Sequence, residues 1–306
     1  MNMIISAVSQ GLIWGLLALG LFISFRVLNV ADMSTEGTFT LGGAVGVQCI
    51  TLGINPFLAS ILAILAGSLA GGITGLMITK LNIPSLLAGI LTMTGLYSIN
   101  LRIMGKANLN LLGMETIFSV FDGFDLPRHV DTILIGLLFI TFIIVMYSLF
   151  FKTELGQSLI ATGDNEAMAR SLGVSTNTMK IVGLMMSNAV TALAGAVIAQ
   201  SNGYADIQMG IGAIVIGLAS VIIGEVIFTR VTFTVRLACL VVGSIFYRLI
   251  MVFVLEAGLN PNDFKLISAI FLALFLALPK IKEIYYVRQY RKKISLERTK
   301  QVTKHD

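Results

Sequence analysis

The sequence predicts an all-α, polytopic helical membrane protein, because it is too apolar to fold as a water-soluble particle. Of its 306 residues, 56% are hydrophobic and 12% are charged, and the mean hydropathy is +0.91. Soluble domains carry roughly twice that share of charged side chains. Apolar runs near the ~20 residues needed to cross a bilayer recur along almost the whole chain. Since a spanning segment must satisfy its backbone polar groups internally, these runs predict helices.

We expect about nine transmembrane helices in one transmembrane domain, residues 1-286, followed by a basic tail, residues 287-306. The N-terminal run begins without Lys or Arg and has no clear small-residue cleavage site, which predicts a retained first helix. Hydropathy puts the spans at 4–25, 38–53, 56–79, 84–104, 132–151, 181–200, 208–228, 232–255 and 264–281.

The basic residues predict how the chain is oriented. If spans alternate, the segments that hold Arg26, Lys80, Lys152 and Lys180 share one side with the tail, and cytoplasmic loops are the ones enriched in Lys and Arg. We therefore predict a multi-pass protein of the plasma membrane with its N-terminus outside and its C-terminus in the cytoplasm. Membrane lipid is the expected partner of the basic tail, and nucleic acid is not expected.

Two polar interruptions look alike, Asn29–Thr40 (NVADMSTEGTFT) and Gln200–Gly212 (QSNGYADIQMGIG). Each follows one span and precedes a Gly-rich span, and five spans separate them, so the two units would face opposite ways. This is the signature of an inverted repeat, whose broken segments approach the substrate route. The candidate pathway residues are Asp32, Glu36, Asn188, Gln200 and Asn202.

A second interpretation of the carboxylates stays open. Asp32 and Glu36 would lie in interfacial water, Asp32 as a helix cap and Glu36 in a first helical turn. Glu225 would pair with Arg230 or Arg236. Arg248, well inside a span, would snorkel or pair with a carboxylate.

A charged segment that is compatible with helix, residues 152-180 and here called the island, lies between two apolar runs. Asp164 or Asn165 is the expected helix cap, Ala167–Leu172 the expected helix, and Gly173 its end. Glu166 and Arg170 would form the polar side of this helix. Met168, Ala169 and Leu172 would form a side that enters a groove on a partner, or else one that rests on lipid.

The island run GQSLIATGDNEAMARSLGVSTNTMKIVGL resembles the cytoplasmic coupling loop of ATP-binding cassette (ABC) importer permeases of the branched-chain amino acid and ribose group. In that family a small-residue helix follows, as in Ser187–Ala199, and then a Gly-rich span like Gly210–Gly224. One departure is that Gly173 follows Glu166 by seven residues rather than six. The acidic opening, with Asp32 and Glu36, is similar to permeases assigned to tryptophan or tyrosine.

The resemblance implies the permease subunit of an ATP-driven importer for a small polar solute such as an amino acid. It implies three partners: an ABC ATPase subunit, a second permease copy or paralogue, and an extracytoplasmic solute-binding protein. The chain has no G-x-x-x-x-G-K-[ST] phosphate loop, so ATP would bind the partner subunit, and we expect no cofactor here. The residues expected to couple to the ATPase are Gly163, Asp164, Asn165, Glu166, Met168, Ala169, Arg170, Leu172 and Gly173.

Two other classes compete with this interpretation. An ion-coupled secondary transporter would also use inverted repeats, broken helices and buried carboxylates. A membrane-embedded enzyme would need an acid, base, nucleophile or metal set at one depth. The only two histidines, His129 and His305, lie outside the predicted spans, so we predict neither catalytic residues nor a metal site.

Overall fold

The structure is a computed structural model that describes residues 2–121, 130–227, 232–256, 266–274 and 277. The described part is a bundle of long helices, which agrees with the predicted all-α class. The last predicted span lies partly, and the basic tail wholly, outside the described residues. The helices and strands are α1 Asn2–Leu21, the π-helical η1 Phe22–Val27, α2 Ser34–Thr51, α3 Pro56–Thr79, α4 Ser85–Met104, β1 Asn108–Asn110, the 3-10 helix η2 Ile117–Phe121, α5 Val130–Phe150, α6 Glu154–Asp164, α7 Glu166–Ser171, α8 Thr176–Asn202, β2 Tyr204–Asp206, α9 Ala213–Ile227 and α10 Phe233–Glu256.

The predicted count of nine spans is not confirmed. Within the described residues, 6 helices are long and apolar enough to cross a membrane, and they comprise α1 with η1, α3, α4, α5, α8 and α10. Helix α2 is rich in Ser, Thr and Gly, which lowers its hydropathy. The described part of α9 has 15 residues, short of the ~20 that a bilayer requires. Helix α2 begins within the first predicted interruption, and α9 begins directly after the second.

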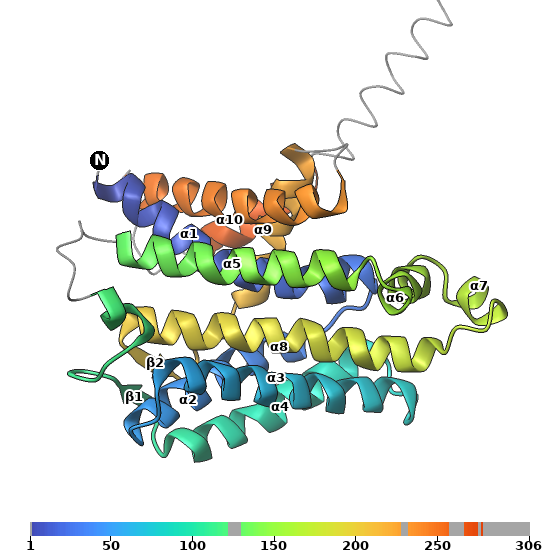
Figure 1. The fold of residues 1–306 in the computed structure, drawn as a ribbon, viewed down its shortest axis with the longest axis horizontal. Helices are drawn as coiled ribbons and strands as arrows, with labels where there is room; N and C mark the ends of the chain where they lie inside the picture. The colour runs from blue at the N-terminus through green and yellow to red at the C-terminus, as the bar shows by residue number, and fades with distance from the viewer. Residues whose placement is uncertain (1, 122–129, 228–231, 257–265, 275–276, 278–306) are drawn as a thin grey trace, which may run out of the picture.

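Helix α8 lies at the centre of the bundle and packs against α1, α2 and α3 (Figure 1). Of its most apolar window, 72% is buried inside the chain, compared with 28% for α4 and for α5. Helix α2 is also almost wholly buried. The chain therefore has an inner pair, α2 and α8, and outer helices whose apolar side chains would face lipid or another protein.

Glycines let the inner helices touch backbone to backbone. A Cβ on Gly42 of α2 would overlap the carbonyl oxygen of Ala192, and a Cβ on Gly195 of α8 would overlap that of Phe39. Such close approach is how membrane helices associate where lipid supplies no hydrophobic drive. Helix α3 packs against α8 in the same way, because a Cβ on Gly67 or Gly71 would overlap backbone atoms of α8.

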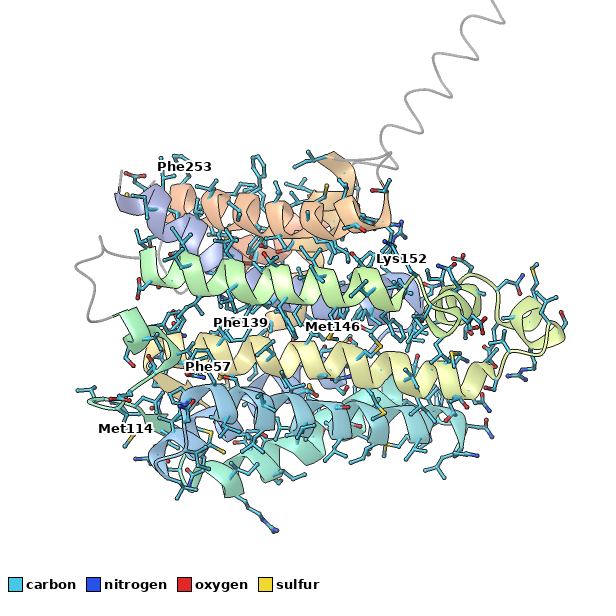
Figure 2. The ribbon with its side chains drawn as sticks, viewed as in Figure 1. Phe57, Met114, Phe139, Met146, Lys152 and Phe253 are labelled. Atoms are coloured by element: carbon cyan, nitrogen blue, oxygen red, sulfur yellow. The ribbon has the colours of Figure 1, made fainter. Side chains whose placement is uncertain are left out.

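The two ends of the bundle differ. At one end, here called the ribbon end, β1 and β2 pair antiparallel, with Asn108 opposite Asp206. At the other, here called the α7 end, α6 follows the end of α5 and α7 lies beyond the long helices (Figure 1). In Figure 2, Phe57 and Met114 lie toward the ribbon end, and Lys152 lies where α5 passes into α6.

Candidate functional site

The island between α5 and α8 folds into α6 and α7, and the backbone breaks between them at Asn165. Asn165 is extended (φ −153°), and its side chain accepts a hydrogen bond from the backbone N–H of Met168 at 3.0 Å. Of the two expected caps, Asn165 is therefore the cap, whereas Asp164 is the last residue of α6. Gly173 follows α7 with a φ of +87°, a conformation that favours glycine and ends the helix.

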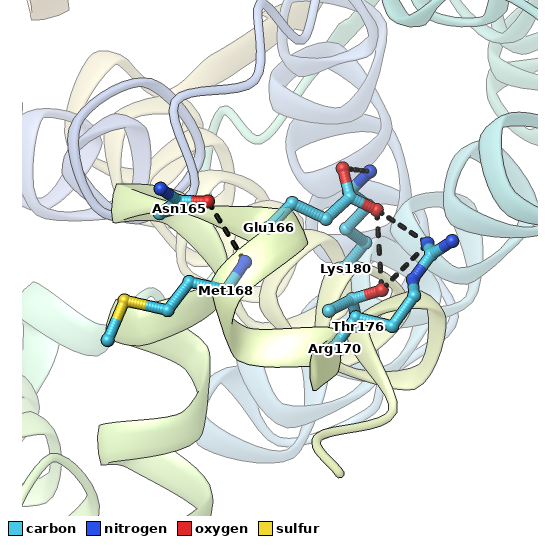
Figure 3. Close-up of polar contacts among 6 residues, drawn as sticks. All are labelled: Asn165, Glu166, Met168, Arg170, Thr176 and Lys180. Atoms are coloured by element: carbon cyan, nitrogen blue, oxygen red, sulfur yellow. Dashed lines mark hydrogen bonds and ion pairs between the residues drawn. The ribbon is translucent and has the colours of Figure 1, made fainter. Parts of the chain in front are cut away.

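Glu166 joins α7 to the beginning of α8 (Figure 3). Its carboxylate accepts from Lys180 Nζ at 2.7 Å, from Arg170 Nη2 at 2.9 Å and from Thr176 Oγ1 at 3.3 Å. The hydrogen bond from Lys180 is the main reason that the pKa of Glu166 is lowered from its ordinary value, with Thr176 and the charge of Arg170 acting in the same direction. The position of α7 is thus fixed relative to α8 by charge-assisted hydrogen bonds.

Two of the three expected apolar residues of α7 are accessible. Met168 and Leu172 are 60% and 71% exposed, and because they are four residues apart they share one face. The expectation for Ala169 is wrong, since this residue is 2% exposed. It follows Met168 by about 100° around the helix and so points inward. Gly163 also packs inward, because a Cβ there would overlap the carbonyl oxygen of Val27.

Asp32 lies in the bundle interior and connects α2 with α8. It is 0% exposed, so its expected place in interfacial water is wrong. The cap position of α2 is Met33 and not Asp32, but Oδ1 of Asp32 accepts from the backbone N–H of Ser34, the first residue of the helix, at 2.9 Å. Its Oδ2 accepts from Asn188 Nδ2 at 2.7 Å, and the same amide nitrogen donates to the carbonyl of Leu184. The structure therefore brings the candidate pathway residues Asp32 and Asn188 together, joined by a direct hydrogen bond.

The two polar interruptions meet in space. Glu36, in the first turn of α2, accepts from the backbone N–H of Gly212 at 2.9 Å. Thr40 Oγ1 accepts from the N–H of Gly210 at 3.1 Å. Helix α9 begins at the next residue, Ala213, so Glu36 holds the start of the second Gly-rich segment. Their relation by an inverted repeat stays a prediction.

The other two candidate pathway residues lie apart from this joint. Gln200 is 3% exposed, donates to Ser60 Oγ at 3.1 Å and accepts from the N–H of Ile117 at 3.1 Å. It therefore ties α8 to α3 and η2. Asn202 is the exposed last residue of α8, at the ribbon end.

Two further charged side chains, Glu225 and Arg248, are paired or stacked. Glu225 forms ion pairs with Arg236, as expected, and with Arg26 at 2.9 Å, which sequence reasoning missed because the two residues are 199 positions apart. Arg230 lies outside the described residues. Arg248 stacks over the ring of Trp14, 4.4 Å from its centre, instead of meeting a carboxylate. Among the described residues, no group of three His, Cys, Asp or Glu side chains could hold a metal ion.

Within the described residues, a bundle of 6 long apolar helices with buried polar joints is the architecture of a polytopic membrane protein. The sequence model described as "Branched-chain amino acid transport system / permease component" matches residues 3–278. The chain therefore belongs to that permease family and is an ABC transporter permease subunit, a multi-pass membrane protein rather than an enzyme. This assignment sets aside the secondary transporter and the membrane-embedded enzyme.

Relatives extend across almost the whole chain. A tyrosine transport system permease protein of Clostridioides difficile is 41% identical over 277 residues, which are 90% of this chain and 91% of the relative. An autoinducer 2 import system permease protein of Yersinia enterocolitica is 30% identical over 69% of this chain and 57% of its own length. A solved metal-chelate type ABC transporter in an inward-facing conformation matches with a TM-score of 0.50 at 15% identity, covering 92% of this chain and 85% of its own, and indicates the fold alone.

Proposed function

We propose that this chain is the permease subunit of an ATP-driven importer of an amino acid, with tyrosine as the first candidate substrate. The similarity to a tyrosine transport system permease supports this substrate, because it covers 91% of that relative. ATP is hydrolysed on a separate ABC ATPase subunit. The importer contains a second permease copy or a paralogue, and an extracytoplasmic solute-binding protein delivers the amino acid.

The observation that carries the proposal is the accessible apolar pair of α7. Met168 and Leu172 are exposed on one side of a short helix whose other contacts are made by Glu166 and Asn165. An ATPase groove that binds these two side chains would hold α7 in place. Because Glu166 ties α7 to Lys180 and Thr176, a displacement of α7 is passed to α8. Helix α8 packs against α1, α2 and α3, so it carries the movement into the bundle.

The proposed orientation puts the α7 end in the cytoplasm and the ribbon end outside. Its support is the distribution of basic side chains, since Lys152, Arg170, Lys180 and Arg236 all lie at or beside the α7 end of their helices. The N-terminus is then outside, the C-terminus is in the cytoplasm, and the solute-binding protein meets the ribbon end.

Site-directed cross-linking tests the coupling role. Met168→Cys and Leu172→Cys are made in a chain whose Cys49 and Cys239 are replaced by serine, and each is co-expressed with the cognate ATPase. Both should form a cross-link to the ATPase. The matched control is Leu112→Cys, which is 85% exposed near the ribbon end and should form none. Cross-linking at Leu112 but not at α7 would contradict the proposal.

Import by the complete system tests the energy source and the substrate. Proteoliposomes that hold permease and ATPase should take up labelled L-tyrosine only with internal ATP and with the binding protein outside. Leu172→Asp should reduce uptake at least about tenfold, because a carboxylate would have to be desolvated in an apolar groove. Uptake that persists without ATP but needs an ion gradient would contradict the proposed function.

A further inference from the structure

We infer that a cavity between α2, α4 and the segment after β2 binds the ammonium group of the transported amino acid, with Asn100 Oδ1 as its hydrogen-bond acceptor. This inference rests on the proposed function, because it names the contact that an amino acid substrate would make. None of the residues expected to line the pathway, Glu36 apart, belongs to this cavity.

The cavity has a volume of about 370 Å³, within the range of small-molecule sites. Three elements wall it: α2 with Glu36 and Thr40, α4 with Tyr97 and Asn100, and the segment after β2 with Ile207 and Ile211. It therefore lies at the joint where the two polar interruptions meet. That joint is held by Glu36 and Thr40, which accept from the backbone of Gly212 and Gly210.

Asn100 is the unusual member of this lining. It is 1% exposed, and its Nδ2 donates to the carbonyl oxygen of Gly37 at 3.2 Å. This bond fixes the amide orientation, because only the nitrogen can donate to a carbonyl. The Oδ1 atom then remains as an acceptor with no hydrogen-bond partner anywhere in the described part of the chain. A buried polar atom without a partner is rare and calls for an explanation, and a bound donor supplies one.

The chemistry of the cavity selects the donor. Asn100 Oδ1 is an acceptor and Glu36 adds a carboxylate to the same lining, so a cationic donor is favoured over an anion. The ammonium group of an amino acid meets both requirements. Tyr97, half exposed, together with Ile207 and Ile211, offers aromatic and apolar surface to the rest of the ligand. An amino acid with an apolar or aromatic side chain fits this pattern.

Equilibrium binding with and without the amino group tests the inference. The probes are L-tyrosine and 3-(4-hydroxyphenyl)propionate, which lacks only the ammonium group. Each is titrated against the full-length permease–ATPase complex in nanodiscs, without binding protein, up to millimolar concentration. We expect the wild type to bind tyrosine at least about tenfold more tightly than the des-amino analogue, as loss of one charge-assisted hydrogen bond implies. Asn100→Leu should bring this ratio close to one.

Two further variants distinguish a loss of the binding contact from a loss of folding. Glu36→Gln is nearly isosteric and still accepts from Gly212, so it should fold normally and yet lower the ratio. Thr92→Val, on the same helix as Asn100, removes the 2.9 Å hydrogen bond to Thr74 but does not line the cavity, so it should leave the ratio unchanged.

The outcomes separate this inference from the proposed function. If the complete wild-type system imports tyrosine but the ratio is the same in wild type, Asn100→Leu and Glu36→Gln, the inference alone is overturned. Import of tyrosine without measurable binding to the permease overturns it as well, and would leave the cavity as packing surface for a second permease copy. If the wild type imports no amino acid of a panel, the proposed function fails and the inference fails with it.

Discussion

Asp32 and Glu166 are both carboxylates at the beginning of a helix. The two side chains differ in burial and in the charge of their partners. Asp32 is fully buried, and its partners are the neutral groups of Ser34 and Asn188. The side chain of Glu166 is 38% exposed, and its partners include Lys180 and Arg170. Leaving a buried hydrogen-bond donor without its acceptor costs about 1–3 kcal/mol, whereas a surface ion pair is worth about 0.2–1 kcal/mol.

This difference in burial indicates that the interior joint at Asp32 stabilises the fold, whereas the segment around Glu166 is available to a partner. The interior joint fixes α2 against α8, and glycine contacts bring the same two helices together. The α7 network fixes only a short helix outside the bundle, at little cost when it is rearranged. Changes in the interior should therefore reduce the stability of the whole chain, whereas changes at α7 should alter coupling to a partner and leave the bundle folded.

The sharpest test of the interior is Gly195→Leu. The new side chain would overlap the backbone carbonyl of Phe39, which no side-chain rotation can relieve, so we expect a loss of about 3 kcal/mol or more. Thermal unfolding of the purified protein in detergent measures it. The matched control is Gly95→Leu in α4, where a Cβ would have no heavy atom of the described chain within 4 Å. Equal melting temperatures for the two variants would show that α2 and α8 are not in contact.

A second test replaces the buried carboxylate. Asp32→Ala removes the acceptor of the N–H of Ser34 and one of the two acceptors of the Asn188 side-chain amide, and should cost about 2–3 kcal/mol in the same unfolding measurement. Asp206→Ala is the control, because Asp206 also accepts from a backbone N–H two residues on, that of Gln208 at 2.8 Å, but in an exposed setting. It should cost under about 1 kcal/mol. If both cost the same, burial does not distinguish the two carboxylates.

The third test addresses an ion pair of intermediate burial. Glu225, 19% exposed, joins Arg26 after α1 to Arg236 in α10. Glu225→Gln keeps the shape but removes the charge, so we expect a loss of about 1 kcal/mol. Glu154→Gln, in the exposed first turn of α6, is the control and should stay within about 0.5 kcal/mol of the wild type. If Glu154→Gln lowered the unfolding free energy more than Glu225→Gln, the expectation that the cost rises with the burial of the carboxylate would be wrong.

Local signals allowed much of the α7 segment to be predicted from the sequence. Asn165 and Gly173 are typical cap and stop residues, and the helix between them begins and ends within one residue of the prediction. Such features depend on neighbours in the chain, which the sequence contains directly.

Features that depend on distant residues could not be predicted in the same way. Asp32 and Asn188 were both candidate pathway residues, but their direct pairing across 156 positions depends on how α2 packs on α8. The burial of Ala169 depends on which side of a short helix faces the rest of the chain. Asn100 was missed because one amide in an otherwise apolar span is typical of a packing residue, and its unpaired oxygen is visible only in three dimensions.

The weakest expected effect is at Glu166, and pH is the means to isolate it. Because its pKa in the folded chain lies below the ordinary value of 4.5, the ionised carboxylate contributes stability above that value. This contribution is lost as the pH falls through the folded pKa. Glu166→Gln should cost about 0.5 kcal/mol at pH 7, with allowance for solvent screening of an exposed group, and progressively less as the pH falls below 4.5.

Unfolding of the wild type and of Glu166→Gln at pH 7 and pH 3, each at 0.15 M and 1 M salt, measures this difference. The gap should narrow both in acid and in high salt, because the Lys180 and Arg170 contacts are accessible to water and ions. A gap that does not narrow at all between pH 7 and pH 3 would mean that Glu166 acts through its shape and not its charge. The variant should still form the bundle while its α7 cross-links to the ATPase less efficiently, since α7, which presents Met168 and Leu172, is then less firmly fixed to the start of α8.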